Sequence, residues 1–356
     1  MKLEGNFSQT GQYDVACLII GRNLGDAVIQ SQFFHKLIQR RFAKRYIVWT
    51  RPQVAFLFEN LPESTVVTSP FPVGTIKQFD FKALRQFLIA VNALRKIRPM
   101  VTLDLIGDFR ERVFAKLIGT TQHLHIGWAV DHPFNLIIRN PLGNGRPSCV
   151  VPQSIPSVYQ AYDLFLNSLT PFNKYSIPDT DAILQPAREI RKRIGLHPFA
   201  SQACRLWPSE KWRDLARRLI EMEMDIDVYS APGEQERLHA IFDCLPHELY
   251  FFSKSLPEFA QRVSKLNLLI GLDSFSVHIA EKYHIPSVTI FGASHPALWL
   301  PPHSIPISSS GGCVSYPCMN KPICERTSTK YACITSVEVI DVLRSAMTAL
   351  SLRSTL

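Results

Sequence analysis

Residues 267–292 read NLLIGLDSFSVHIAEKYHIPSVTIFG, and this stretch decides the fold class. The apolar run 267–273 is typical of a buried strand, 276–284 has the period of a helix, and 286–292 returns to strand-like sequence. A strand, a helix and a second strand joined by short turns form a parallel βαβ unit, because parallel strands need a crossover connection. The sequence therefore predicts α/β architecture with parallel sheets.

The same alternation runs along the chain in two stretches. Further strands are expected at 13–20, 45–50, 100–107, 194–200 and 225–231, and further helices at 27–43, 81–99, 110–119, 209–222, 234–245 and 256–266. Residues 140–186 contain seven prolines and one expected helix at 159–169, and we interpret them as the connection between the halves. Two Rossmann-like domains are predicted, 1–175 and 176–335, followed by a terminal helix within 336–356.

Composition limits the classes of function. The chain has 356 residues, of which 46% are hydrophobic and 19% charged, so it can bury a large core and is not intrinsically disordered. Sixteen glycines are too few for a collagen-like repeat. A net charge of +9 favours an anionic partner, which could be nucleic acid, a phosphorylated small molecule or an acidic membrane surface.

The sequence also predicts where the protein works. Residues 1–14 lack the features of a signal peptide, and apolar runs such as 15–20 are far shorter than the roughly 20 residues that span a bilayer. Any membrane contact is therefore expected to be peripheral. Two of the eight cysteines, Cys17 and Cys149, lie near apolar strand-like sequence, which favours a reducing cytoplasm over an oxidised, secreted protein.

The first candidate site lies in residues 18–30, LIIGRNLGDAVIQ, where a strand passes through a glycine-containing turn into a helix. This turn places backbone N–H groups, Asn23, Gly25 and Asp26 at the carboxyl edge of the sheet, where ligands bind in open α/β folds. A dinucleotide fingerprint would need a third glycine at the right spacing. Asp26 could instead be a first-turn carboxylate that the helix dipole favours.

Two further strand-to-helix passages carry polar groups. Residues 195–212, GLHPFASQACRLWPSEKW, offer the Ser201 hydroxyl and the Arg205 guanidinium, which can make a forked contact with phosphate. In 268–283, Asp273, Ser274 and Ser276 surround a helix N-terminus, and His278 follows on the helix. The alternatives are a solvent-facing loop for the first passage and an ordinary helix cap with a packed histidine for the second.

Two more groups of residues come from the second half. Glu234 follows a strand and a Pro-Gly turn, where a carboxylate can accept from both hydroxyls of a ribose, although glutamate is equally expected at a helix start. Cys313, Cys318, Cys324 and Cys333 are separated by four, five and eight residues, a looser spacing than that of common zinc sites. Free or packed thiols, a disulfide and a metal knuckle all remain open for them.

Four segments, taken in order, resemble the lipopolysaccharide heptosyltransferases of glycosyltransferase family 9, and the resemblance runs from about residue 14 to residue 350. The segments are LGDAVIQ at 24–30, LDLIGDFRERVFAKLIG at 103–119, RLWPSEKW at 205–212 and GLDSFSVHIAEKYHIPSVTIFG at 271–292. The resemblance implies a GT-B architecture, with the acceptor on the first domain and the nucleotide-sugar donor on the second. It also implies that the last helix, with Val337, Ile340, Leu343, Met347 and Leu350 on one face, packs back on the first domain.

The resemblance further implies a mechanism and a set of ligands. Asp26 matches the family's proposed general base in an inverting transfer that needs no metal or cofactor. The donor phosphates would contact Ser201 and Arg205, and the donor ribose would contact Glu234. Asp273 and Ser274 match the loop that grips the diphosphate and sugar. The expected reaction moves heptose from ADP-heptose to a lipopolysaccharide core or related saccharide, with another nucleotide-sugar or a non-catalytic binding role as alternatives.

The sequence departs from the family pattern at two places. Phe275 stands where the family usually has glycine, and its side chain disfavours positive φ and would crowd a ligand near the backbone. A pair of basic residues before the Trp-Pro is reduced to Arg205 followed by Leu206. These departures bear on the identity of the donor more than on the fold.

Two basic stretches, 35–45 and 84–99, lie in the expected acceptor domain. They match the charge of a phosphorylated acceptor at the inner leaflet of the membrane, and the alternative is a solvated helix face. Nucleic acid is a poorer match, because the basic helices lack a recognised binding module and an aromatic stacking pattern.

Overall fold

The computed structural model describes residues 13–20, 23–72, 80–136, 146–170, 192–230, 233–243, 245–246, 249–319 and 321–353. The chain divides into two compact units, the first formed by Met1–Pro156 with Gln160–Pro178 and the second by Ser157–Tyr159 with Asp179–Leu356. The domain boundary expected after residue 175 lies outside the described residues.

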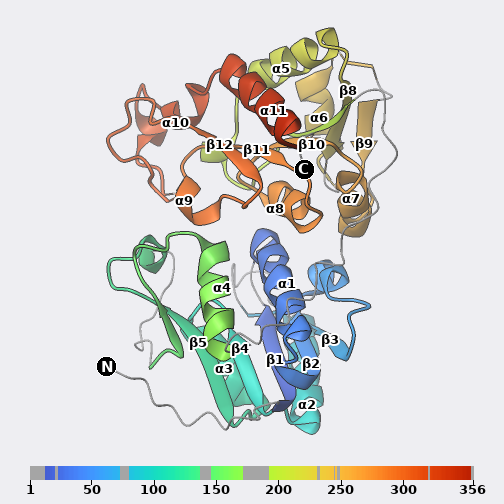
Figure 1. Cartoon of the computed structure of the whole chain (residues 1–356), viewed down its shortest axis with the longest axis vertical. Helices are drawn as coiled ribbons and strands as arrows, with labels where there is room; N and C mark the ends of the chain where they lie inside the picture. The colour runs from blue at the N-terminus through green and yellow to red at the C-terminus, as the bar shows by residue number, and fades with distance from the viewer. Residues whose placement is uncertain are drawn as a thin grey trace. The chain divides into compact units, whose positions relative to one another are not determined.

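The first unit is built on a parallel six-stranded sheet in the order β3-β2-β1-β4-β5-β6 (Figure 1). Its strands are β1 (Tyr13–Ile20), β2 (Ala43–Thr50), β3 (Ser64–Thr68), β4 (Val101–Asp104), β5 (Gln122–Trp128) and β6 (Cys149–Val151). β1 pairs with β2 on one side and β4 on the other, and its last six residues are all buried, which explains why the strand is apolar on both faces. The predicted parallel α/β class is confirmed.

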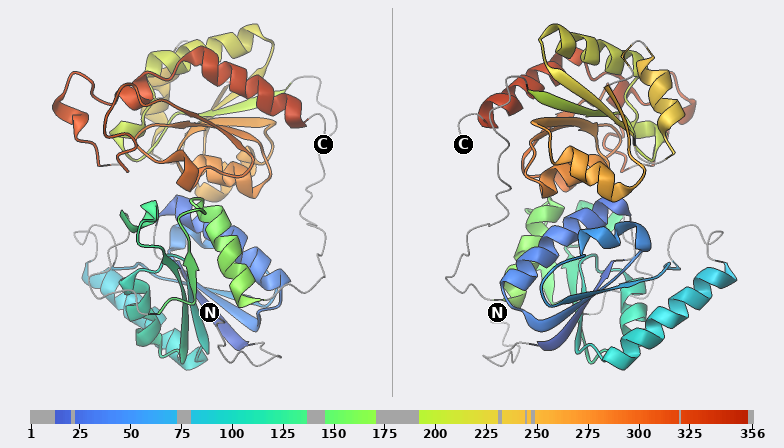
Figure 2. Two further views of the ribbon diagram at one scale, coloured as in Figure 1. Left: turned by 60° about the vertical axis from the view of Figure 1, so that its left-hand side comes forward. Right: turned by 90° about the vertical axis from the view of Figure 1, so that its right-hand side faces the viewer.

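Helices cover both faces of this sheet (Figures 1 and 2). They are α1 (Leu24–Gln39), α2 (Phe81–Ile97), α3 (Phe109–Ile118) and α4 (Val158–Leu169). α2 and α3 pack on one face, where Phe87 and Phe114 lie against the indole of Trp49. α1 and α4 lie side by side on the other face, where the ring of Phe33 stacks on that of Phe165 at a centroid distance of 6.0 Å.

The interpretation of 140–186 as a simple connection was wrong in its described part. β6 adds a sixth strand to the first sheet, and α4 packs on α1, where Lys36 Nζ donates to Asp163 Oδ1 at 2.7 Å and Arg40 Nη1 donates to Asn167 Oδ1 at 2.8 Å. Prolines at the ends of these short elements had suggested a linker, whereas they separate elements of the same unit.

The second unit repeats the plan with a parallel six-stranded sheet in the order β12-β11-β10-β7-β8-β9. Its strands are β7 (Arg193–His197), β8 (Asp225–Ser230), β9 (Tyr250–Phe252), β10 (Leu268–Leu272), β11 (Ser287–Phe291) and β12 (Ser304–Ser308). Its helices are α5 (Ser209–Glu221), α6 (Gln235–Phe242), α7 (Leu256–Val263), α8 (Phe275–Lys282), α9 (Pro296–Trp299), α10 (Ala332–Thr335) and α11 (Val339–Arg353). None of the helices in the described segments is long and apolar enough to cross a bilayer.

The expectation that the last helix returns to the first domain was wrong. α11 packs on the second sheet beside α5, and its buried residues Val342, Ala346 and Ala349 belong to the same core as Trp212 of α5 (Figure 1). Trp207 Nε1 donates to the Val337 carbonyl at 3.0 Å and fixes the chain just before α11 begins. An apolar stripe needs a surface to cover, but the stripe does not specify which surface that is.

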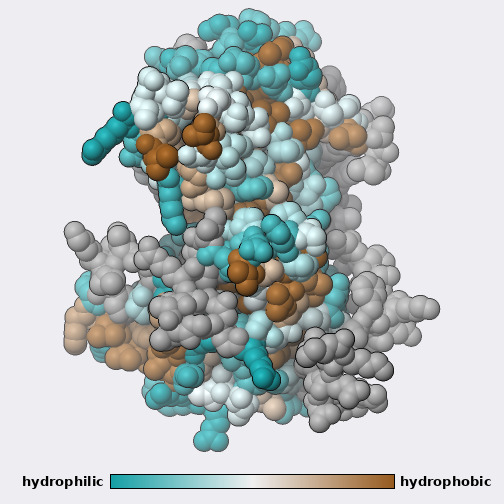
Figure 3. All heavy atoms as spheres, turned by 90° about the vertical axis from the view of Figure 1, so that its left-hand side faces the viewer, coloured by the Kyte–Doolittle hydropathy of each residue, from teal (hydrophilic) through white to brown (hydrophobic). Residues whose placement is uncertain are grey.

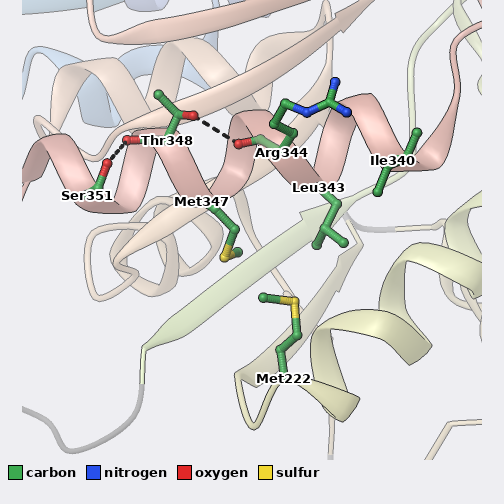
Figure 4. A pocket seen from close by; sticks show the side chains of 7 residues that line it. All are labelled: Met222, Ile340, Leu343, Arg344, Met347, Thr348 and Ser351. Carbon is green, nitrogen blue, oxygen red and sulfur yellow. Dashed lines mark hydrogen bonds between the residues drawn. The ribbon is translucent and has the colours of Figure 1, made fainter.

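The face that α11 buries matches the predicted stripe in part, because Val337 and Leu350 are buried in the core of the second unit. Ile340 is 48% exposed, whereas small alanines let the helix approach the sheet closely. Leu343 and Met347 are only partly buried and point toward Met222 at the end of α5 (Figure 4). Together they line a shallow hollow of about 510 Å³, none of whose lining residues comes from the loops that follow β7 or β10.

Candidate active site

The second sheet changes direction between β7 and β10. From β7 the chain continues outward to β8 and β9, and from β10 it continues the other way to β11 and β12. The loops that follow β7 and β10 therefore leave the sheet on opposite sides and open a crevice at its carboxyl edge, the usual ligand position in such sheets. Ser201 and Arg205 lie after β7, and Asp273 and Ser274 lie after β10, as the sequence predicted.

Arg205 and Asp273 join the two loops directly. Arg205 Nη1 donates to the main-chain carbonyl oxygen of Asp273 at 3.0 Å and lies 3.3 Å from Asp273 Oδ2. The Arg205 side chain is 18% exposed and that of Asp273 is 5% exposed, so the pair is fixed at the wall of the crevice. A guanidinium carries five N–H donors, and one edge can hold Asp273 while another faces a ligand.

Gly292 brings Arg205 into place. Arg205 ends the short helix η4 (Ala203–Arg205), which packs against the end of β11, where Ala293 N donates to the Cys204 carbonyl at 3.3 Å. A Cβ atom at position 292 would lie 2.4 Å from that carbonyl oxygen and 3.3 Å from Arg205 Cα. Only glycine allows this approach, which gives a physical reason for the Phe-Gly that closes the strand.

The loop after β10 leads straight into α8. Ser274 is the N-cap residue with φ −155°, and its hydroxyl lies 3.2 Å from that of Ser276. Phe275 is the first helical residue and its ring lies 5.7 Å from that of Phe259 on α7. Phe275 thus begins the helix and packs on a neighbouring helix. His278 follows in the same helix.

Glu234 lies at the carboxyl edge of β8, next to β7. It immediately precedes α6, its side chain is 24% exposed, and Glu234 Oε1 lies 3.9 Å from Arg237 Nη1. The Arg237 guanidinium lies 4.9 Å from the centre of the Phe199 ring, in the loop after β7. The carboxylate is therefore on the same edge as Arg205 and Asp273, at a strand beside the crevice.

The first sheet has an equivalent direction change between β1 and β4. Asn23, Gly25 and Asp26 occupy the turn after β1 and the first turn of α1, as predicted. Asn23 is the N-cap residue, and its Nδ2 donates to Asp26 Oδ2 at 3.3 Å. Asp26 is half-buried, so its carboxylate is positioned at the edge but remains within reach of a ligand.

The turn after β4 supplies groups that the sequence analysis did not single out. Asp104 Oδ1 accepts from the N–H groups of Ile106 and Gly107, both at 2.8 Å, which shapes the turn. Asp108 is fully buried. Its two carboxylate oxygens accept hydrogen bonds from Arg110 Nε and Nη2 at 2.9 and 2.8 Å. Hydrogen bonding to Asp108 raises the pKa of Arg110, so its cation is permanent.

The Arg110 side chain is 31% exposed. It follows β4, which is the neighbour of β1, the strand that leads to Asp26. The sequence carries a signal for this site in residues 104–110. The first of two aspartates four positions apart ends the apolar strand, and an arginine comes two positions after the second aspartate. The first unit thus offers on adjacent turns a carboxylate, which can accept a proton, and a cation, which can bind an anionic group.

Cys313, Cys318, Cys324 and Cys333 are free thiols in the structure. Burial, with a contribution from Cys318, Cys313 and Cys324, raises the pKa of Cys333 to about 11. In the segments that the structure describes, no three His, Cys, Asp or Glu side chains are arranged to hold a metal ion.

The model of glycosyltransferase family 9 (heptosyltransferase) matches residues 120–333, more than half of the chain. The chain belongs to this family. It is therefore a glycosyltransferase, as the resemblance of its motifs predicted. A search of curated proteins finds no match to it.

Solved structures agree on the fold of this family 9 chain. A family 9 glycosyltransferase from Veillonella parvula has a TM-score of 0.66 at 16% identity, over 96% of this chain and 98% of that one. The ADP-heptose lipopolysaccharide heptosyltransferase II of E. coli has a TM-score of 0.60 at 15% identity, over 95% and 99%. The E. coli heptosyltransferase WaaC with ADP has a TM-score of 0.59 at 14% identity, over 82% and 92%. The two α/β units thus have the GT-B type of fold.

Proposed function

We propose that the protein transfers heptose from ADP-heptose to a lipopolysaccharide core or a related saccharide, with inversion at the anomeric carbon and without a metal ion. The donor would bind at the second sheet and the acceptor at the first. The observation that carries the proposal is the Arg205–Asp273 contact, which assembles a cation and a helix N-terminus at the direction change of the second sheet.

In the proposed reaction, the Asp26 carboxylate accepts the proton of the attacking acceptor hydroxyl as its oxygen bonds to the anomeric carbon. The bond from that carbon to the diphosphate oxygen breaks, and its electron pair leaves with ADP. Arg205 and the N–H groups at the start of α8 stabilise the charge on the departing diphosphate. Asp273 holds Arg205, Ser201 and Ser274 supply hydroxyl contacts, and Glu234 accepts from the ribose.

The location of the reaction is part of the same proposal. A lipopolysaccharide acceptor is anchored in lipid, so the enzyme would work as a peripheral protein at the cytoplasmic face of the inner membrane. The chain's net charge of +9 supports this location, because acidic lipid and a phosphorylated core are both anionic.

Asp26→Asn tests the catalytic assignment. It should lower turnover of ADP-heptose at least a hundredfold while leaving the affinity for ADP, measured by calorimetry, within about twofold. Asp14→Asn is the matched control, because Asp14 lies at the opposite end of β1 and pairs with Lys44. Unchanged turnover in Asp26→Asn would remove Asp26 from the mechanism.

Calorimetry with ADP, UDP, GDP and their sugars tests the donor. Selective binding of ADP and ADP-heptose is expected. A preference for UDP or GDP would replace the donor in the proposal, and binding of a nucleotide-sugar without turnover of any acceptor would favour a non-catalytic binding protein.

A further inference from the structure

α2 buries one side and leaves the opposite side uncovered by the residues that the structure describes. The buried side consists of Ala83, Phe87, Ala90, Val91 and Leu94. The opposite side is the outer face of α2, which consists of Phe81, Leu88 and Ile89 with Lys82, Arg85 and Lys96. Its three large apolar side chains are 83%, 55% and 58% exposed.

Apolar side chains gather over α2 in the space-filling view, at the lower left of Figure 3. Single exposed apolar residues are common on protein surfaces, but phenylalanine, leucine and isoleucine together on the outer side of one helix are not required by the fold. Core packing already accounts for the other side of α2, so the outer face needs a separate explanation.

The charges on the outer face have one sign. The helix sequence FKALRQFLIAVNALRKI contains four cations and no acidic residue. Among the described residues, Lys82, Arg85 and Lys96 form no ion pair, in contrast to Lys36 and Lys44 of the same unit, which pair with aspartates at 2.7 and 2.8 Å. The nearby Asp80 carboxylate is occupied as the N-cap, where it accepts from Ala83 N at 2.8 Å.

We propose that the outer face of α2 docks on an anionic lipid bilayer. The apolar side chains would enter the boundary between headgroups and acyl chains, while the long basic side chains reach the phosphates around them. A second copy of the chain fits this face poorly, because a two-fold contact would set Lys82 and Arg85 against themselves.

The position of α2 agrees with the proposed function, on which the meaning of this docking rests. α2 connects β3 to β4, so it runs antiparallel to the strands and begins at the carboxyl edge of the first sheet. Phe81 and Lys82 therefore lie at the end of α2 nearest the edge that carries Asp26. A bilayer held there would bring a lipid-anchored saccharide to the acceptor side of the unit.

Flotation of the full-length protein with lipid vesicles tests the proposal. The protein should bind vesicles of phosphatidylethanolamine with phosphatidylglycerol and bind phosphatidylcholine vesicles at least tenfold less. Lys82→Glu with Arg85→Glu should lower binding to the anionic vesicles at least tenfold, because each basic residue near such a surface contributes about fivefold. Leu88→Ser with Ile89→Ser should lower it by a similar factor and also weaken binding in high salt.

Matched controls separate this surface from bulk properties. Lys254→Glu with Lys265→Glu makes the same change in net charge at exposed sites of the second unit, and Val314→Ser with Ile323→Ser removes apolar side chains that are 99% and 75% exposed there. Both controls should bind vesicles like the unaltered protein. Equal losses in the controls and the α2 variants would overturn the proposal, as would failure of the unaltered protein to bind anionic vesicles.

The same variants distinguish this proposal from the proposed function. ADP affinity and transfer to a detergent-solubilised acceptor should be unchanged in the α2 variants. If transfer fails in the unaltered protein while vesicle binding follows the expected pattern, the reaction is wrong and the docking surface stands. If light scattering shows a dimer that the α2 variants dissociate, the face is an interface between copies and the docking proposal is wrong.

Discussion

Arg205 Nη1 lies 3.0 Å from the carbonyl oxygen of Asp273 and 3.3 Å from its carboxylate, so the cation of one loop is held by the backbone and side chain of another. The two residues are 68 positions apart in the chain. They meet because β7 and β10 are neighbours in the sheet, and the contact orients the guanidinium before any ligand arrives.

Replacing Arg205 with lysine should weaken ADP binding about tenfold or more, although the charge is kept. A lysine ammonium lacks the planar set of N–H donors with which a guanidinium can bind Asp273 and a phosphate at the same time. The loss of one hydrogen bond to a charged group weakens binding by about 1.5–3 kcal/mol. Calorimetric titration with ADP provides the measurement. Arg218→Lys on α5 is the control and should bind ADP normally, because this arginine pairs with Asp214 on the surface of the same helix.

Arg110→Met should raise the KM for the saccharide acceptor at least tenfold and leave ADP affinity unchanged, because Arg110 lies on the first unit beside the strand that leads to Asp26. Arg110→Lys should recover much of the loss if the charge binds an anionic group. A lower melting temperature is also expected for Arg110→Met, since the buried Asp108 carboxylate would lose two hydrogen bonds from the guanidinium. Lys116→Ala, farther along α3, should affect neither quantity, and an equal rise of KM in that control would contradict the assignment.

The Val337 carbonyl accepts from both Trp207 Nε1 at 3.0 Å and Lys211 Nζ at 2.8 Å. Trp207→Phe should lower the free energy of unfolding by about 1 kcal/mol through the lost hydrogen bond. Lys211→Met should lower it by at least as much, because Lys211 Nζ also donates to the Thr335 carbonyl and to Glu338 Oε1, both at 2.9 Å. Together they should cost more than the sum, because the carbonyl is then left without either donor. Urea denaturation of the unaltered protein, the two single variants and the double variant measures the coupling free energy between the two side chains.

Trp212→Phe combined with Lys211→Met is the matched control for this cycle. Trp212 is equally buried, and its Nε1 has no hydrogen-bond partner among the described residues. The control pair should therefore be additive. Additivity in the Trp207 pair as well would show that the shared carbonyl does not couple them.

Acid should destabilise both units before their carboxylates titrate. Burial lowers the pKa of His123 in the first unit and of His197 in the second to about 4, whereas an unfolded histidine titrates near 6.5. The unfolded chain therefore binds protons that the folded chain does not, and stability falls as the pH drops from about 6.5 toward 4. Each histidine should lower the free energy of unfolding by up to about 2 kcal/mol between pH 7 and pH 5.

Scanning calorimetry across this pH range measures the loss. His197→Leu removes a titrating group that is packed between Phe199 and Phe259, and it should flatten the pH dependence without changing the effect of His123. An unchanged slope in this variant would show that His197 is not neutral and buried as described.

Much of the framework follows from local pattern. The strand expected at 13–20 has the observed bounds, and helices expected at 81–99 and 209–222 end within two residues of the observed ones, because their apolar periods and caps are strong. β5 was not identified, because QHLHIGW alternates histidines with apolar residues. His125 is nevertheless buried, and the partly buried His123 lies with its Nδ1 2.8 Å from Thr102 Oγ1.

The sequence by itself determined the α/β class, the repetition of the plan and the turns that carry Asp26, Arg205 and Asp273, since these depend on short-range periodicity and on the turn from each strand into its helix. Only the tertiary structure decided that α11 covers the second sheet, that Phe275 packs on Phe259, and that Arg110 lies on the turn beside the one that carries Asp26. An amphipathic pattern fixes which side of an element is buried, but the surface that buries it is chosen by packing between residues far apart in the chain.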